Sequence, residues 1–175
     1  MTEIVFELLR NRGCADYIGE PVSQIEHMLE AGQCALDKGY PDFVITAALL
    51  HDIGHLLPDQ ILMDDLGVKD HEIVGANYLH SLGFNDEVCD LVRNHVNAKR
   101  YLVTINEDYV LSEASARTLE YQGGRMSSAK LLEFKQRKNF DWYLKMRAID
   151  ELAKGDQISR LTLEDFRSIC DRCCS

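Results

Sequence analysis

Six residues that commonly bind metals occur at intervals along a chain whose other patterns are those of a helical protein. They are four histidines and two aspartates: His27, His51, Asp52, His71, His95 and Asp150. Imidazole and carboxylate ligands together suit iron, manganese or zinc, and an aspartate between two sets of histidines can bridge two cations. The residue types and their order therefore predict a metal site.

The apolar residues beside these candidates strengthen the prediction. A single histidine on a partly apolar helix is usually a core or surface residue, so each histidine taken alone indicates little. The apolar run Ala47–Leu50, however, directs His51 and Asp52 towards the interior. An ionised aspartate is costly there without a cation or strong hydrogen bonds. His80 matches no such position and is expected to be structural or solvent-facing.

The hydrophobic pattern predicts an all-α fold, a compact helical bundle. Apolar residues recur at helical spacing almost throughout, and no β-branched run is bounded by hairpin turns. With 175 residues and no internal repeat or linker, one domain spanning residues 1–175 is expected. The predicted helices cover approximately residues 3–12, 24–38, 41–50, 71–82, 86–99, 112–121, 128–138 and 140–154, followed by a short C-terminal one.

Polar residues at the predicted helix starts indicate where the helices that carry the candidate ligands begin. Each candidate ligand lies on or at the end of a different helix, and the adjacent pair His51-Asp52 falls at a helix end. Neighbouring positions within a helix point about 100° apart, so the pair can converge on one site only at such an end. The expected N-caps are Ser23 with Glu26, Asp70, Asn85, and Thr162 with Asp165.

Charge and composition exclude several classes of partner. The chain has 19 Lys and Arg against 29 Asp and Glu, a net charge of −10, which argues against binding nucleic acid or anionic membranes. An anionic substrate would therefore need a local cationic pocket. The N-terminus does not resemble a signal or transit peptide, and no stretch approaches the ~18 apolar residues of a membrane span, so a cytoplasmic location is expected.

The six cysteines form no recognisable framework of disulfides. Reduced thiols are expected, because a domain of this size does not need covalent staples. Cys170, Cys173 and Cys174 include a C-x-x-C pair, but no second pair or nearby histidine completes a zinc site. These three residues are interpreted as a structural tail, with a metal or redox site as the less favoured alternative.

The order His27, His51-Asp52, Asp150 resembles the H…HD…D signature of the HD superfamily, most members of which are metal-dependent phosphohydrolases. A more extensive resemblance, from about residue 16 to 151, is to the small HD-domain mixed-valent diiron oxygenases that degrade organophosphonates. The segments that carry it include Asp16–Glu20, Ser23–Gln24, Glu26–His27, His51–His55, His71–Glu72, Lys99–Val103 and Thr118–Gly124.

This resemblance implies a site of two iron ions, Fe(II) and Fe(III), with dioxygen as co-substrate. One iron would be held by His27, His51, Asp52 and Asp150, and the other by His71, His95 and the bridging Asp52. The implied reaction cleaves the C–P bond of a small organophosphonate of the 1-hydroxy-2-aminoethylphosphonate type. The products would be phosphate and glycine, or an N-methylated glycine.

The resemblance also implies residues for the phosphonate end of the substrate. Lys99 follows His95 by one helical turn, so a metal-bound ligand would be within its reach. In the family's pattern the remaining contacts near the phosphonate come from Ser115, Thr118, Gln122 and Arg147. Apart from the resemblance, Lys99 and Arg147 would be taken for exposed cations and Ser115 for a surface serine.

Three further residues are implied near the substrate. His55 would approach the substrate without binding metal, and it stands where many hydrolytic relatives have lysine. Tyr17 would occupy the open iron site until substrate arrives, and Glu20 would pair with the substrate's ammonium group. The alternative for these two is a tyrosine packed on the core and a solvated glutamate.

Other functions remain compatible with the residues alone. An HD-type phosphohydrolase acting on a nucleotide or phosphate ester would need no oxygen and could use manganese, magnesium or zinc. A non-catalytic module that binds a phosphorylated ligand is less favoured, because every expected metal ligand is present.

Glu20 favours a primary amine over a methylated one, since a quaternary ammonium cannot donate hydrogen bonds. The sequence leaves open whether the substrate's amine is methylated, and it leaves the oligomeric state open as well.

Overall fold

A computed structural model describes residues 1–15, 22–64, 66–154 and 159–174. These residues form nine α-helices and one 3₁₀ turn, with no strand among them, which confirms the expected all-α fold. In chain order the elements are α1 (Thr2–Arg12), α2 (Gln24–Asp37), α3 (Asp42–Leu50), η1 (Ile53–Leu56), α4 (His71–Ser81), α5 (Asp86–Ile105), α6 (Glu113–Leu119), α7 (Ser128–Lys135), α8 (Phe140–Leu152) and α9 (Leu163–Arg172).

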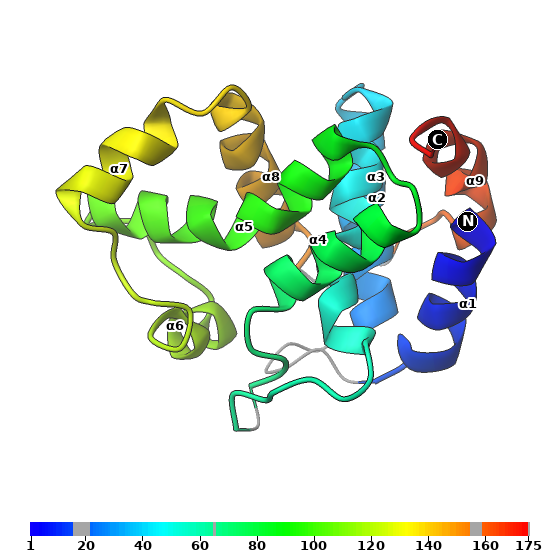
Figure 1. Ribbon diagram of the computed structural model, residues 1–175, viewed down its shortest axis with the longest axis horizontal. Helices are drawn as coiled ribbons and strands as arrows, with labels where there is room; N and C mark the ends of the chain where they lie inside the picture. Colours follow the sequence, from blue (N-terminus) through cyan, green and yellow to red (C-terminus); the bar gives the residue numbers. More distant parts are fainter. Residues whose placement is uncertain (16–21, 65, 155–158, 175) are drawn as a thin grey trace.

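The helices are arranged around α3 and the long helix α5 (Figure 1). Helix α2 packs along α3, α4 and α8 both pack on α5, and η1 lies against α4. Helices α1 and α9 lie together at one side, so the two termini are neighbours (Figure 1). Helices α6 and α7 lie near the far end of α5 (Figure 1). The centre of the bundle is thus where α2, α3, α4, α5 and α8 meet.

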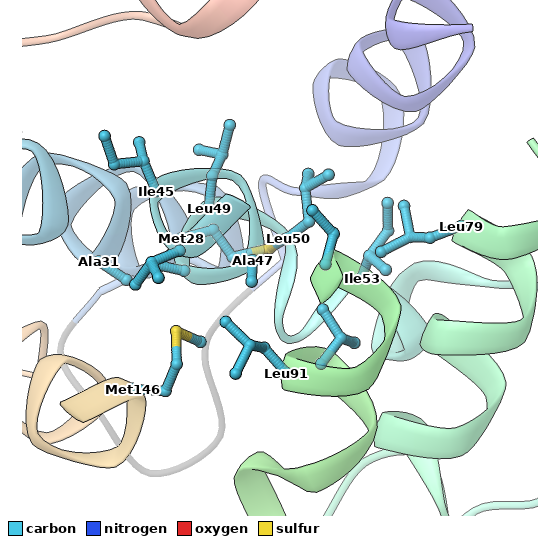
Figure 2. Packing of buried hydrophobic residues seen from close by; sticks show 14 of the residues in the cluster. Met28, Ala31, Ile45, Ala47, Leu49, Leu50, Ile53, Leu79, Leu91 and Met146 are labelled. Atoms are coloured by element: carbon cyan, nitrogen blue, oxygen red, sulfur yellow. The ribbon is translucent and has the colours of Figure 1, made fainter. Parts of the chain in front are cut away.

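The core is built on α3. Every residue of this helix from Val44 to Leu50 is buried, as its almost continuous apolar sequence predicts. Figure 2 shows Leu49 and Leu50 among side chains from α2, α4, α5 and α8. Burying a large aliphatic side chain contributes roughly 1.5–3 kcal/mol. The end of α3 is consequently a firmly held point from which His51 and Asp52 project.

A close contact between two backbones fixes the turn that follows α3. A Cβ atom on Gly54 would lie only 2.0 Å from the carbonyl oxygen of His71. On the other side of this contact, a Cβ atom on Gly75 would lie 3.0 Å from the backbone nitrogen of Gly54. Only glycine permits such an approach, which brings η1 and the start of α4 together.

The local signals for helix starts are largely confirmed. Ser23 with Glu26 and Thr162 with Asp165 form complete capping boxes, and the Asn85 side chain accepts from the Val88 backbone N–H at 3.0 Å. These caps satisfy backbone donors that would otherwise lack a partner at the beginning of each helix. They orient the three helices α2, α5 and α9.

Several predicted boundaries were wrong. Asp70 adopts a left-handed conformation (φ 54°) and makes no side-chain cap, and Pro41 lies at the N-cap of α3 instead of in its first turn. Helix α5 continues to Ile105 instead of ending near Lys99. Tyr101 explains the extension, because its ring lies 5.1 Å from that of Phe140 and this packing holds the additional turn.

The C-terminal cysteines belong to the core. Cys170 and Cys173 are buried, and the Cys173 sulfur accepts a hydrogen bond from the Thr46 hydroxyl at 3.4 Å. Burial raises the pKa of Cys170 to about 12. All six cysteines are free thiols, as expected. Within the described ranges, no helix has both the length and the apolar character needed to cross a membrane.

Candidate metal centre

The six predicted ligands converge at the centre of the bundle from five elements. His27 lies in the first half of α2, His51 and Asp52 connect α3 to η1, His71 begins α4, His95 is central in α5, and Asp150 is near the end of α8. All six are at most 4% exposed. Side chains separated by more than 120 positions in sequence therefore share one buried polar site.

The first cluster comprises His27, His51 and Asp150. The Nε2 atoms of His27 and His51 are 3.1 Å apart, and the Asp150 Oδ1 lies 3.5 Å and 3.8 Å from them, respectively. Two ligand atoms that are each about 2.1 Å from one cation are separated by about 3.0–3.5 Å at octahedral or tetrahedral angles. The spacing of these atoms fits a single metal ion.

The second cluster is joined to the first by Asp52. The Nε2 atoms of His71 and His95 are 3.1 Å apart, and the Asp52 Oδ1 lies 3.4 Å and 3.5 Å from them. The other carboxylate oxygen, Oδ2, lies 3.4 Å from the His51 Nε2 and 3.8 Å from the His27 Nε2. Each oxygen of Asp52 thus faces one pair of histidines, which is the arrangement of a carboxylate that bridges two cations.

Hydrogen bonds to backbone carbonyls set the orientation of three histidines. The Nδ1 atoms of His27, His51 and His95 lie 3.2, 2.8 and 2.7 Å from the carbonyl oxygens of Ala153, Ala48 and Val92, respectively. A neutral imidazole that donates from Nδ1 has its lone pair on Nε2, which is the tautomer that binds metal. In the first cluster two such lone pairs face each other at 3.1 Å, an arrangement that a cation stabilises.

The buried carboxylates fit the same interpretation. The Asp150 Oδ1 is buried and accepts no hydrogen bond from any residue the structure describes. Burial alone would raise the pKa of Asp52, but the imidazoles around it outweigh that effect and hold the pKa well below its ordinary value. Burial likewise opposes ionisation of Asp150, while Lys154 and Arg147 keep its pKa well below the usual range. Both aspartates are therefore anionic groups available to cations.

His55 lies beside the centre but is oriented differently. Its ring stacks on that of His71 with the centroids 4.0 Å apart, and its Nδ1 accepts a hydrogen bond from the Val68 backbone N–H at 3.0 Å. Burial and the neighbouring His71 lower the pKa of His55 to about 3, so the ring is neutral at pH 7. Since Nδ1 already accepts, Nε2 is the ring nitrogen left for other contacts, and His55 also groups with Asp52 and His71 at spacings that could hold a metal ion.

A pocket of about 520 Å³, counting its open mouth, lies next to the two clusters. It is lined by every described residue predicted to contact substrate: His55, Lys99, Ser115, Thr118, Gln122 and Arg147. Met63 and Leu66, from the segment between η1 and α4, form an apolar part of its wall. Tyr17 and Glu20 lie outside the described residues.

Lys99 is buried in this pocket, contrary to the usual exposure of lysine. Its Nζ donates to the Thr118 hydroxyl at 3.1 Å and lies 3.5 Å from the Ser115 carbonyl oxygen. Burial, together with the nearby positive charge of Arg147, lowers the pKa of Lys99 to about 7. An anion in the pocket would compensate for the cost of keeping this ammonium charged.

Arg147 and Gln122 add further polar groups. Arg147 is buried, forms ion pairs with Asp150 and Glu151, and donates to the Ser115 hydroxyl at 3.3 Å. The Gln122 side-chain oxygen is buried and makes no hydrogen bond within the described part of the chain. Polar groups that are arranged around a cavity in this way favour a small, highly charged ligand.

Two polar residues of the pocket were not among those predicted. Lys154 extends from the end of α8, with its Nζ 2.7 Å from the Ser115 hydroxyl and 3.6 Å from the Asp150 Oδ1. Its position four residues after Asp150 on the same helix face was a usable signal. Gln24 lines the pocket from the first turn of α2, and its buried side-chain oxygen accepts no hydrogen bond from described residues.

The fold and the metal-ligand pattern define an HD domain, and the family model described as "HD domain" matches residues 25–154. A [1-hydroxy-2-(trimethylamino)ethyl]phosphonate dioxygenase (glycine-betaine-forming) from Leisingera caerulea is 39% identical over 158 residues, covering 88% of this chain and 80% of that protein. A hydroxymethylphosphonate dioxygenase from Gimesia maris is 37% identical over 177 residues, covering 97% and 86%. The chain belongs to the HD-domain phosphonate dioxygenases, which are oxygenases that cleave C–P bonds.

A third relative extends the similarity to a viral protein. The uncharacterized protein L432 of Acanthamoeba polyphaga mimivirus is 40% identical over 170 residues, covering 94% of this chain and 78% of the viral one. The two dioxygenases named above act on small organophosphonates with different groups at the carbon end.

Proposed function

We propose that this protein is a diiron oxygenase that uses dioxygen to cleave the C–P bond of a 1-hydroxy-2-aminoethylphosphonate type substrate. The products are phosphate and glycine, or an N-methylated glycine where the amine is methylated. Both the hydroxyl-bearing carbon and the phosphorus gain one oxygen atom, so one dioxygen molecule is consumed for each phosphate released. This assignment rests on membership of the phosphonate dioxygenase family.

The bridging position of Asp52 is the structural observation that carries the proposal. Its two oxygens lie 3.4 Å from the Nε2 atoms of His51 and His71, one on each side. His27 and Asp150 complete the first metal site, and His95 completes the second. A Fe(II)/Fe(III) pair held by these residues would supply a Lewis acid for substrate oxygens and the one electron that activates dioxygen, while the substrate would supply the electrons for its complete reduction.

The chain's own side chains bind the substrate beside this centre. Lys99 and Arg147 pair with the phosphonate oxygens, and such charge-assisted hydrogen bonds are shorter and stronger than neutral ones. Thr118 and Gln122 line the same part of the pocket, with the Thr118 hydroxyl fixed by Lys99 at 3.1 Å. These contacts place the carbon–phosphorus bond against the metal ligands.

The opposite side of the pocket holds the hydroxyl-bearing carbon. His55 donates from Nε2 and stays neutral through the working pH range, because its pKa is about 3. Met63 and Leu66 cover this side with apolar surface and exclude water from the reacting centre. Tyr17 and Glu20 complete the proposed site as a gating residue and a partner for the substrate's ammonium group.

Oxygen consumption measured together with phosphate release tests the proposal. Iron-loaded protein is supplied with 1-hydroxy-2-aminoethylphosphonate in an oxygen electrode, and one phosphate is expected for each dioxygen consumed. The trimethylated analogue and hydroxymethylphosphonate are tested in parallel, with the primary amine expected to give the highest kcat/KM. Phosphate release from ordinary esters without oxygen uptake, using manganese or zinc, would refute the oxygenase and establish a phosphohydrolase instead.

A further inference from the structure

Lys154 is a buried cation of the pocket, and the reaction described above assigns it no task. Its side chain is 6% exposed. The Nζ atom lies 2.7 Å from the Ser115 hydroxyl, 3.0 Å from a Glu151 oxygen, 3.5 Å from the Ser112 hydroxyl and 3.6 Å from the Asp150 Oδ1. Helices α6 and α8 thus meet at this ammonium group, next to a metal-facing carboxylate.

Lys154 is one of three cationic side chains in the pocket. The others are Lys99 and Arg147, and both Arg147 and Lys154 pair with Asp150 and Glu151. The carboxylates of Asp52 and Asp150 face the histidine clusters, so bound metal ions would use their charge. Buried ammonium and guanidinium groups are costly unless they are paired. Three cations that line one pocket attract an anionic ligand, and a doubly charged anion gains more from them than a singly charged one.

Lys154 also determines what the Ser115 hydroxyl can do. The oxygen accepts from the Lys154 Nζ at 2.7 Å and from the Arg147 guanidinium at 3.3 Å. A hydroxyl group has two acceptor positions and one hydrogen to donate. With both acceptor positions occupied, the Ser115 hydroxyl can add a further hydrogen bond only as a donor. Ser115 and Lys154 therefore act as a pair of donors.

We infer that Lys154, together with Ser115, binds an oxygen of the substrate's phosphonate group and selects doubly charged phosphonates over singly charged analogues. The inference deepens the proposed function and rests on it for the identity of the anion. It adds a specificity-determining residue from the end of α8 to the contacts made by Lys99 and Arg147. The ammonium is placed for this task by Ser115 and Glu151.

Binding measurements with two matched probes test the role of Lys154. Hydroxymethylphosphonate carries a hydroxymethyl group on a doubly charged phosphonate, and glycolate carries the same group on a singly charged carboxylate. Calorimetric titration of metal-loaded Lys154→Met is expected to show about ten- to a hundredfold weaker binding of hydroxymethylphosphonate. Glycolate binding should change by less than about threefold. Metal content, measured on the same samples, should equal that of the wild type.

Two further variants serve as controls. Lys154→Arg keeps the positive charge and should recover most of the affinity for hydroxymethylphosphonate. Lys145→Met removes an exposed lysine of α8, the helix that ends just before Lys154, and should change neither affinity. If Lys154→Met gives too little folded protein, Lys154→Gln replaces it, since a polar side chain is easier to accommodate beside Ser115.

Equal losses for the two probes would overturn the inference, because a purely structural lysine would weaken both alike. Unchanged binding of hydroxymethylphosphonate by the charge-removing variants, or no binding by the wild type, would overturn it as well. Failure of the proposed function is a separate result. It appears as an absence of oxygen uptake with every phosphonate, even where Lys154-dependent binding is observed.

Discussion

The Tyr121 hydroxyl donates a hydrogen bond to the Asp64 carboxylate, and the two oxygen atoms are 2.5 Å apart. This contact joins two segments that both line the pocket, since Met63 precedes Asp64 and Gln122 follows Tyr121. Both partners lie at the surface, where they are accessible to solvent. The bond therefore connects the segment after η1 to the segment after α6.

Removing this bond should loosen the wall of the pocket without unfolding the protein. Tyr121→Phe is expected to raise KM by a few fold and to speed proteolytic cleavage between residues 58 and 68, with a stability loss of about 1 kcal/mol at most. Limited proteolysis with and without a phosphonate measures the effect. Tyr40→Phe is the matched control. Identical cleavage rates for the two variants would contradict a role for the Tyr121 bond in holding this segment.

His71 is predicted to be a ligand of the second metal ion. His71→Ala should reduce the metal content from two ions per chain to one and abolish nearly all oxygenase activity, because one histidine of the second cluster is lost. Elemental analysis of protein loaded with excess iron measures the stoichiometry. His80→Ala removes an exposed histidine from the same helix and should retain both ions. Two ions in His71→Ala would refute the ligand role.

Asp52 should matter more for metal binding than any single histidine. In Asp52→Asn one carboxylate oxygen becomes an amide nitrogen that cannot bind a cation, and the remaining oxygen can serve only one cluster. The affinity for the second metal ion is expected to fall by more than about a hundredfold. Asp59→Asn is the control, since Asp59 is exposed and asparagine tolerates its left-handed backbone (φ 59°). Competition with a chromophoric chelator compares the variants.

Lys99 should make stability depend on pH. Burial lowers the pKa of the Lys99 ammonium group to about 7 in the folded protein, so the group loses its proton near pH 7. In an unfolded chain a lysine keeps its proton up to about pH 10.4. Between these values the unfolded state binds more protons, so the free energy of unfolding rises with pH.

Lys99→Met should remove the part of the pH dependence of unfolding that comes from Lys99. At pH 6 the variant is expected to be more stable than the wild type by about 2 kcal/mol or more, and the difference should shrink as the pH approaches 10. The same variant should raise KM for a phosphonate. Urea unfolding at several pH values measures the first effect, and Lys38→Met, at an exposed site, supplies the baseline. A difference that grows with pH would contradict the buried-cation interpretation.

Gly54 is predicted to tolerate no side chain. In Gly54→Ala the added carbon would meet the His71 carbonyl oxygen at 2.0 Å, so η1 and α4 must separate. The expected result is a loss of several kcal/mol together with loss of metal binding. Gly39→Ala is a useful comparison, because Gly39 has a left-handed backbone (φ 66°) but open space around it. That variant should lose only about 1 kcal/mol. Equal melting temperatures for the two variants would disprove the steric argument.

Local signals in the sequence predicted the positions of the metal-facing residues well. The capping box at Ser23 placed His27 in the first turn of α2, and the apolar run of α3 placed His51 and Asp52 at a buried helix end. These predictions succeeded because they depend on neighbouring residues. One domain extending over all 175 residues stays a prediction.

Features that depend on contacts between distant segments could not be predicted in the same way. The sequence from Tyr101 to Ile105 is rich in β-branched and aromatic residues, and tertiary packing makes it helical. The left-handed Asp70 lies directly before His71, whose carbonyl oxygen is approached by Gly54. Lys154 had no individual sequence signal beyond its spacing from Asp150, since its partner Ser115 lies on another helix.

The distribution of the proposed ligands over the chain has a consequence for folding. His27 and Asp150 are 123 positions apart, and the other ligands come from three intervening segments. A metal pair held by them would act as a cross-link that closes several long loops at once, comparable to a set of disulfides between distant residues. Metal loading and cooperative folding would then be one equilibrium, and a chelator would act as a denaturant.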